Sequence, residues 1–569
     1  MDETAQWDRM GLGKSRKIFR WISDQCADPE RSGGYRWFIP QAVDFPDQYV
    51  QMLPSISELP LVVNSDACDD STTCPLPLPT LWERSGAWDV SGGNGTISDD
   101  VDAQSWDEEL TMLLGLEGRG RYFQNRITLH PDGDQNDPLY CDGDGMMLSD
   151  SYAVTYPGGQ TYTIDTGFFS LYGAEDTVSW SAENGTNVRF NRTLPLAYEN
   201  GYIPSISYGL HIGSVYPNVS ASLVLGGYDS SRVLSDPIVS ITDTFTLNTI
   251  GLSSVGGYMY YGEPEPNDNQ LTTPGMDIKI NPGAAYLYLP RATCDKIADF
   301  LPVKYDEDFN LYLWDKSDSA FRNITTSLHF ISFGFASSNN RTQNINVPFG
   351  LLNLTLTSPL VSDPTPYFPC SPLQDGQTAT LGRAFLQAAF LAQNWQTERI
   401  YLSQAPGPDY ESEYIRTIDM DDTQLTPATN PPTWASTWTS TLPPWDDSKG
   451  SSGTGSGLSG GTIAGIVVGI IALLAILAGA GLWLNRRRKR RQSWVKPTES
   501  PPLELAAGRQ SRGANAYQEG SSYAFYKPDQ RPVEIFEAEA RPPAQEMDSS
   551  QQIQELSADR DSRYEWNKG

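Results

Sequence analysis

Histidine and positive charge are both scarce in this chain. Only three His occur, His130, His211 and His329, and they lie too far apart for the ligand spacing of a metal site. Lys and Arg total 40 against 70 Asp and Glu, for a formal net charge of -30. An acidic surface of this kind repels nucleic acid. The sequence therefore predicts no metal, no cofactor and no nucleic-acid partner.

Cysteines and glycosylation motifs are missing from the C-terminal part. The six cysteines all precede residue 371: Cys26, Cys68, Cys74, Cys141, Cys294 and Cys370. The seven Asn-X-Ser/Thr sequons begin at Asn94, Asn184, Asn191, Asn218, Asn323, Asn340 and Asn353. The sequons predict a glycoprotein. The cysteines predict that the first part of the chain lies in an oxidising compartment and the last part in a reducing one. Residues 1–32 lack the apolar run of a signal peptide, so we leave this segment unassigned.

One long apolar run is present, at residues 463–484. Its 22 uncharged residues are enough to cross a hydrocarbon core of about 30 Å. Six basic residues follow, Arg486 to Arg491, which places the C-terminus in the cytoplasm by the positive-inside rule and can contact anionic lipid. We therefore expect a single-pass type I protein of the plasma membrane or secretory pathway, with its helix at 462–485 and its N-terminus extracellular or lumenal. Gly465 and Gly469 form a candidate homodimerisation face in this helix.

The remaining chain divides by composition. Residues 33–405 contain short alternating apolar runs separated by Gly, Pro, Asn and Asp, which predicts an all-β ectodomain. Residues 406–461 are rich in Ser, Thr, Pro and Gly, which predicts a flexible stalk. Residues 486–569 have the composition of a disordered cytoplasmic tail.

A strand-turn-strand pattern at residues 276–290 organises the ectodomain. Met276, Ile278 and Ile280 alternate with polar residues, as in a half-buried strand. A turn at 281–283 (NPG) follows, and a second alternating run then carries Leu287 and Leu289. The pattern predicts two strands joined by a small-residue turn.

Several such segments, in this order, resemble the pepsin-like aspartic peptidases, in particular a fungal, membrane-anchored branch. The turn at 281–283 resembles the active-site loop of that family. The segments 203–208 (IPSISY) and 221–231 (ASLVLGGYDSS) are similar to the end of its first lobe, and 379–387 (ATLGRAFLQ) to a late motif. The resemblance implies a bilobal fold, with lobes of roughly 33–235 and 236–405.

The resemblance also implies disulfides. Cys294 and Cys370 match the disulfide of the second lobe, and Cys68 and Cys74 match a small-loop disulfide of the first. Cys26 and Cys141 then remain as a third pair.

The catalytic positions depart from the family pattern. Aspartic peptidases use two carboxylates that share a proton, one from each lobe. The matching position in the second lobe is Asn281, and the alignment of 49–63 places Pro54 at the position in the first lobe. Neither residue can act as a general acid or base, so no catalytic pair is intact.

One fallback acid is Asp165, in an Asp-Thr-Gly tripeptide. No Ser or Thr follows it, and residues 168–173 resemble the apolar strand that comes after the flap, so we interpret it as a chance match. The flap itself is expected at 113–122, with Leu116 at the position where the family usually has Tyr.

Two functional readings follow. The first is a membrane-anchored pseudo-protease whose cleft binds an extended peptide or protein by strand addition. The alternative is an active aspartic-type endopeptidase that uses Asp165. A cell-wall or adhesion role stays open because of the stalk and the sequons.

Overall fold

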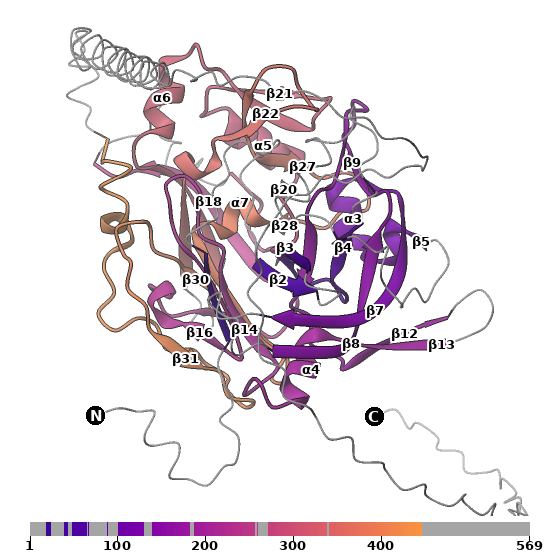
Figure 1. Ribbon diagram of the computed structural model, residues 1–569. Coiled ribbons are helices and arrows are strands. Elements are labelled where there is room, and N and C mark those ends of the chain that lie inside the picture. The colour runs from indigo at the N-terminus through magenta and orange to yellow at the C-terminus, as the bar shows by residue number, and fades with distance from the viewer. Residues whose placement is uncertain are drawn as a thin grey trace, which may run out of the picture. The chain divides into compact units, whose positions relative to one another are not determined.

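The computed structural model describes residues 19–23, 39–43, 48–64, 67, 88, 101–129, 139–181, 187–256, 259, 271–337 and 341–445 (Figure 1). Within these ranges the chain is rich in β-strand and contains short helices, as predicted. The expected membrane span at 462–485, the dimerisation pair and the tail lie outside them. No helix in the described part combines the length and apolarity needed to cross a bilayer.

A six-stranded sheet receives strands from both halves of the chain (Figure 1). Its order is β1 (Phe19–Ser23), β15 (Ala221–Leu225), β14 (Ser207–His211), β29 (Ala389–Asn394), β30 (Arg399–Gln404) and β17 (Ile238–Ser240). β14 and β29 are antiparallel neighbours, with Ser207 opposite Asn394. The outer strand β1 belongs to the N-terminal segment that we left unassigned, so this segment takes part in the fold.

Lobe 1 is built on a nine-stranded sheet. Its order is β12 (Thr177–Ser181), β13 (Asn187–Asn191), β8 (Leu139–Ser149), β4 (Leu61–Val63), β11 (Gly167–Ser170), β3 (Gln48–Ser55), β2 (Ile39–Val43), β7 (Arg119–Leu129) and β5 (Val101–Asp102). A small sheet lies beside it: β10 (Thr161–Thr163), β9 (Ala153–Thr155) and β6 (Leu116–Glu117).

Lobe 2 has a seven-stranded and a four-stranded sheet. The first runs β24 (Thr342–Pro348), β23 (His329–Ala336), β18 (Phe245–Ser254), β19 (Met276–Ile280), β28 (Thr380–Leu381), β20 (Leu287–Leu289) and β27 (Cys370–Pro372). The second runs β21 (Val303–Asp306), β22 (Leu311–Trp314), β26 (Thr365–Phe368) and β25 (Leu354–Leu356). In β19, Ile278 and Ile280 are buried while Asp277 is exposed, which confirms the predicted alternation.

The helices are short. They are α3 (Glu108–Leu114), α4 (Thr193–Glu199), α5 (Arg291–Ala298), α6 (Ser319–Thr325) and α7 (Arg383–Leu386), with 3-10 turns η3 (Ala103–Ser105), η5 (Ser230–Arg232), η6 (Phe349–Leu352) and η7 (Trp434–Thr437). One contiguous apolar core runs through both lobes and includes Leu61, Phe169, Leu287 and Phe385, all fully buried. The described part of the chain is therefore mostly β-strand with few helices, as predicted, and lobe 1 and lobe 2 denote its residues before and after residue 235.

The prediction of a flexible stalk is wrong for its first part, residues 406–445. Residues 406–445 pack on the lobes: β31 (Ile415–Thr417) pairs with β16 (Gly227–Asp229), and the side chains of Trp438 and Leu442 are fully buried. Composition was misleading here because a few aromatic and aliphatic side chains anchor a segment that is otherwise rich in Ser, Thr and Pro.

Candidate functional site

The lobe 2 turn follows β19. The backbone N–H of Asn281 donates to Leu381 O at 3.2 Å, and its side-chain Oδ1 accepts from Gly283 N at 2.8 Å. Arg383 Nη1 donates to Gly283 O at 2.6 Å and to Pro282 O at 3.2 Å. The Asn281 amide therefore closes the turn on itself, a role that Asn and Asp side chains commonly play.

The lobe 1 turn follows β3. Ser55 O accepts from Leu171 N at 2.8 Å, and Ser55 Oγ donates to Phe169 O at 3.3 Å. Ser57 O accepts from Ser170 Oγ at 2.6 Å. Strand β11 and Leu171, the residue after it, are therefore hydrogen-bonded to this turn.

Strand pairing relates the lobe 1 turn to the lobe 2 turn. In lobe 1, Phe168 of β11 pairs in parallel with Leu53 of β3 and antiparallel with Leu61 of β4. The residue after Leu53 is Pro54.

The lobe 2 pairing has the same form. Leu381 of β28 pairs in parallel with Ile280 of β19 and antiparallel with Leu287 of β20. The residue after Ile280 is Asn281. Counted from the parallel pairs, the residue corresponding to Asn281 is Pro54. Counted back from Leu61 and Leu287 it is Ser55, because the lobe 1 turn is one residue longer. Neither Pro54 nor Ser55 carries a carboxylate.

The two turns lie against each other. A Cβ atom added to Gly283 would come within 3.1 Å of Ser55 Cβ and of Asn281 Oδ1, and within 2.7 Å of Leu110 Cδ2. Asn281 is 6% exposed, and Ser55 and Leu110 are fully buried. The junction is consequently filled by side chains of this chain.

Helix α3 of lobe 1 contributes Leu110, the side chain that packs on Gly283 at this junction. Asp107 caps the helix by accepting from Leu110 N at 2.8 Å. Glu109 pairs with Lys279 of β19 at 2.6 Å, and Met112 O accepts from Gln377 Nε2 of lobe 2 at 2.8 Å. The helix is therefore bonded to lobe 2 on both sides of Leu110.

The loop between β9 and β10 also reaches lobe 2. Tyr156 and Tyr286 hydroxyls are 2.7 Å apart, and Gly158 N donates to Asp308 O at 2.8 Å. The Tyr156 ring packs edge-on against Phe309 with centroids 5.5 Å apart. Burial raises the pKa of Tyr286 to about 12, so both phenols stay neutral and hydrogen-bonded at ordinary pH.

Residues 113–122 do not form the flap that was predicted for them. Residues 113–122 contain the end of α3, the two-residue strand β6 and the start of β7, and β6 pairs with β9, not with β7. Gly115 ends α3 with φ 62°, and Gly118 at φ 130° redirects the chain between β6 and β7. In this structure the loop between β9 and β10, not 113–122, crosses to the other lobe.

Each carboxylate near the turns has another partner. Glu58 pairs with Arg192 at 2.7 Å and Glu109 with Lys279. Burial raises the pKa of the Asp107 carboxyl, whereas the Leu110 N–H and the nearby Ser57 hydroxyl oppose the shift. These acids are used for helix capping and ion pairing.

The fallback acid lies away from the turns. Asp165 is fully buried and accepts from Thr166 Oγ1 at 3.0 Å. Gly167, two residues later, already pairs with Met52, which itself precedes Pro54 by two residues. Asp165 itself comes before β11 begins, on the side of Met52 and not of Pro54.

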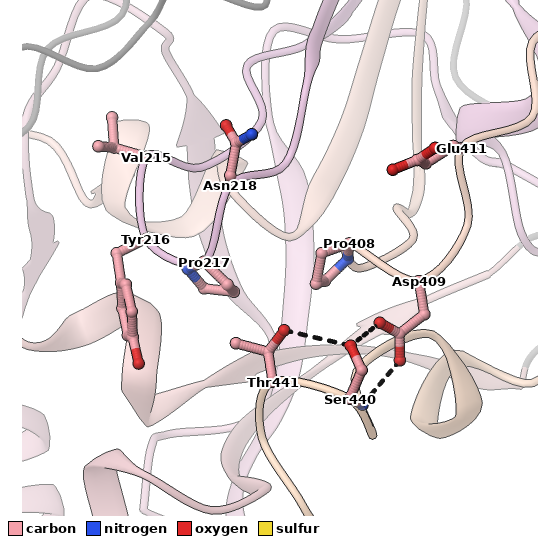
Figure 2. A pocket seen from close by; sticks show the side chains of 9 residues that line it. All are labelled: Val215, Tyr216, Pro217, Asn218, Pro408, Asp409, Glu411, Ser440 and Thr441. Atoms are coloured by element: carbon pink, nitrogen blue, oxygen red, sulfur yellow. Dashed lines mark hydrogen bonds between the residues drawn. The ribbon is translucent and has the colours of Figure 1, made fainter. Parts of the chain in front are cut away.

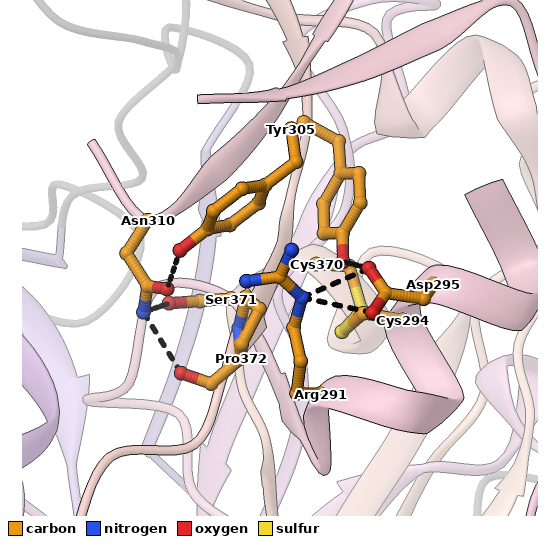
Figure 3. Close-up of a disulfide and its surroundings, with 9 residues drawn as sticks. Arg291, Cys294, Asp295, Tyr305, Asn310, Cys370, Ser371 and Pro372 are labelled. Carbon is orange, nitrogen blue, oxygen red and sulfur yellow. Dashed lines mark hydrogen bonds and ion pairs between the residues drawn. A yellow bond between two sulfur atoms is a disulfide. The ribbon is translucent and has the colours of Figure 1, made fainter. Parts of the chain in front are cut away.

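The predicted disulfide of lobe 2 is present. Cys294 of α5 is bonded to Cys370 of β27, which closes a loop with a sequence separation of 76 (Figure 3). Beside it, Arg291 Nε bonds both carboxylate oxygens of Asp295 at 2.9 Å and its guanidinium stacks 3.6 Å from the Tyr305 ring centroid. The link therefore sits in a well-packed corner of lobe 2.

The other cysteine predictions fare differently. Cys141 is a free, buried thiol that contacts Thr193 O at 3.8 Å, so its pairing with Cys26 is wrong. It had been paired only as the remaining cysteine, and the Leu139–Ser149 strand instead buries it in the core. Cys26, Cys68 and Cys74 lie outside the described residues.

Four predicted glycosylation positions are described. Asn218 is exposed, while Asn191, Asn323 and Asn353 are half-buried. Asn94, Asn184 and Asn340 lie outside the described residues. Within the described part, no group of three or more His, Cys, Asp or Glu is placed to hold a metal ion.

No family model and no curated protein matches the chain. Among solved structures, the crystal structure of aspartic proteinase from Irpex lacteus is similar with a TM-score of 0.41 and 12% identity, over 68% of this chain and 97% of that chain. A likeness of this size indicates neither activity nor ligand for this chain.

Sequence reasoning missed the role of α3. A readable signal was present, because Asp107 precedes Glu108 and Glu109, and Leu110, Leu113 and Leu114 follow with helical spacing. That signal predicts a capped amphipathic helix, but it does not say which surface receives the apolar side.

Proposed function

We propose that this chain is a single-pass membrane glycoprotein with a pepsin-like, catalytically inactive ectodomain that binds an extended peptide or protein partner at the cell surface. The proposal is supported by the lack of a carboxylate where the two strand-turn-strand motifs correspond. On the parallel strand pairs these positions are Pro54, an imino acid, and Asn281, an amide, and on the antiparallel pairs the lobe 1 residue is Ser55.

The chemistry of Pro54 and Asn281 argues against peptide hydrolysis. Proline has no titratable group, and an Asn amide stays neutral across the pH range, so neither can take a proton from water. Loss of one general base commonly costs about 10²- to 10⁴-fold in rate. In addition, the Leu110 side chain packs against Gly283 of the lobe 2 turn, which places an apolar group beside this turn.

Partner binding is proposed for the groove between the lobes. Aspartic-peptidase folds accept extended chains there, and added strands gain affinity from backbone hydrogen bonds. Access in this chain requires the loop between β9 and β10 to leave Tyr286 and Asp308. The resting form would thus be closed, and a partner would select an open form.

The topology proposal is supported by the sequence alone. The span at 462–485, the basic run from Arg486 to Arg491 and the sequons on its N-terminal side agree with one orientation. The cytoplasmic tail would then be available to intracellular proteins while the ectodomain meets its ligand outside.

Hydrolysis is tested on the purified full-length protein. We expect no cleavage of a mixed peptide library between pH 2.5 and 6, with or without the aspartic-peptidase inhibitor pepstatin. Inhibitor-sensitive cleavage that is lost in Asp165→Asn would overturn the proposal and establish the alternative, an active aspartic-type endopeptidase. An ectodomain used for this purpose should keep residues 19–445, because β1 and the 406–445 segment belong to the fold.

Partner binding is tested with a fluorescent library of extended peptides. Tyr156→Phe removes one hydrogen bond of the closed loop, worth about 1 kcal/mol, and should tighten binding up to about fivefold. Tyr216→Phe, at an exposed tyrosine remote from this loop, is the matched control and should bind as the parent does. Equal affinity in all three proteins would contradict a groove that must open.

A further inference from the structure

A surface cavity of about 710 Å³ is lined by residues from the segments 215–218, 408–411 and 440–441 (Figure 2). One side carries Tyr216, Pro217 and Asn218, and the other carries Pro408, Asp409 and Glu411. Its volume falls in the range of ordinary ligand pockets, about 300–1,000 Å³.

The first side is a rigid loop that presents a glycosylation motif. Ser214 and Val219 exchange backbone hydrogen bonds of 2.9 and 2.7 Å, and Ser214 Oγ donates to Tyr216 O at 2.9 Å. Asn218, at the tip, is exposed and begins the sequon that ends at Ser220. A glycan attached there would start at the mouth of the cavity.

The second side joins two segments near the end of the ectodomain. Asp409 N donates to Thr437 O at 3.0 Å, and the Asp409 carboxylate accepts from Ser440 N at 2.9 Å and from Ser440 Oγ. This carboxylate is therefore engaged in holding residues 437–441 in place.

The lining has the chemistry of a sugar site. Tyr216 is 54% exposed and, with Pro217 and Pro408, offers flat apolar surface for the C–H face of a ring. The Glu411 carboxylate and the Thr441 hydroxyl offer hydrogen bonds to sugar hydroxyls. The lining contains no Lys or Arg, so nothing in it selects an anion.

We propose that the N-glycan of Asn218 folds back into this cavity and ties the 214–219 loop to the 408–411 and 437–441 segments. Covalent attachment at the mouth gives the first sugars a high effective concentration in the cavity, so weak individual contacts suffice. The inference needs only the secretory-pathway topology of the proposed function, not its inactive site.

Glycopeptide mass spectrometry of the full-length protein tests occupancy, and limited chymotrypsin digestion tests the tie. Asn218→Gln and Ser220→Ala both remove the glycan, but only the second keeps the Asn218 side chain. Both should raise the rate of cleavage after Tyr410 at least fivefold and lower Tm by a few degrees relative to the glycosylated parent.

Two controls separate the glycan from its docking. Asn323→Gln removes a sequon outside the cavity and should leave cleavage after Tyr410 unchanged. Tyr216→Ala should reproduce the faster cleavage while Asn218 stays glycosylated.

An empty Asn218 in protein glycosylated at other sequons would overturn this inference and leave the proposed topology intact. Absence of glycan at every sequon would overturn both. Unchanged cleavage in Asn218→Gln and Ser220→Ala, with the parent occupied, would show that the glycan does not dock.

Discussion

The turns of the two lobes are held by matching ladders of strand pairs and yet share almost no side-chain chemistry. Phe168 and Leu381 each pair with both strands of their motif, whereas the residue after the parallel partner is Pro54 in lobe 1 and Asn281 in lobe 2. Apolar pairs and backbone hydrogen bonds therefore maintain the motif in both lobes, and the carboxylate in the lobe 1 turn, Glu58, pairs with Arg192.

The lobes also differ in how they are stabilised. Lobe 2 is cross-linked through Cys294 and Cys370. The described part of lobe 1 buries several ionisable groups, among them the free thiol Cys141 and the carboxyl of Asp144, both in β8. Each difference can be tested by a substitution that affects one lobe and spares the other.

The largest effect is expected from Cys294→Ser combined with Cys370→Ser. Releasing a loop of this length should cost about 4 kcal/mol of unfolding free energy in the chain-entropy view. Hydrogen exchange should show the loss in residues 287–372 first, with β8 of lobe 1 protected as before. Cys141→Ala, which breaks no cross-link, is the control, and an equal loss in both lobes would show that they do not differ in this respect.

Leu110→Ala removes the side chain wedged between the turns. Truncation of a fully buried leucine typically costs about 2–5 kcal/mol because a cavity remains. Thermal unfolding measures the effect. Leu114→Ala, at a half-buried position of the same helix, should cost clearly less, and equal losses would mean that Leu110 has no special part at the junction.

Asp144→Asn should change the pH dependence of stability. Burial raises the pKa of Asp144 to about 8, although a hydrogen bond from Thr193 Oγ1 at 2.5 Å opposes this. The folded protein then keeps a proton that the unfolded chain releases near pH 4, so stability should fall as pH rises toward 8.

The buried His211 gives stability the opposite dependence on pH. Burial, reinforced by nearby Arg232, lowers the pKa of His211 to about 3, so stability should fall as pH drops from 6.5. Above about pH 7 the His211 side chain is largely neutral in the unfolded chain too, so the range from pH 7 to 7.5 reports mainly on Asp144. Chemical denaturation there should show a slope approaching one proton in the parent and none in Asp144→Asn, while Asp142→Asn, at an exposed neighbour, should keep the parent slope.

Lys279→Met should have the smallest effect. Lys279 bonds Glu109 at 2.6 Å and Asp243 at 3.1 Å, but all three side chains are partly exposed, and such pairs contribute about 1 kcal/mol or less. Thermal unfolding measures the effect. The control is Lys304→Met, which changes an exposed lysine of β21. A loss larger than that of Leu110→Ala would mean that charge, not packing, holds α3 on lobe 2.

Local alternation predicted the strands around Asn281, because a sequence displays such a period directly. The Cys294–Cys370 link was implied by the resemblance to pepsin-like peptidases, and the structure contains it. The match of Pro54 to Asn281 stays a prediction. The position of α3 and the reach of Tyr156 to Tyr286 depend on contacts across more than 100 residues, which no local pattern encodes. The packing of Trp438 was missed because its neighbours have the composition of a linker.

The six-stranded sheet makes the two lobes mutually dependent. A gene cut between them would separate β14 from β29 and leave each fragment with an open edge along its innermost strand. Such fragments would aggregate when produced alone, but they should recover a native assembly when synthesised together, so complementation of split halves would succeed where either half fails.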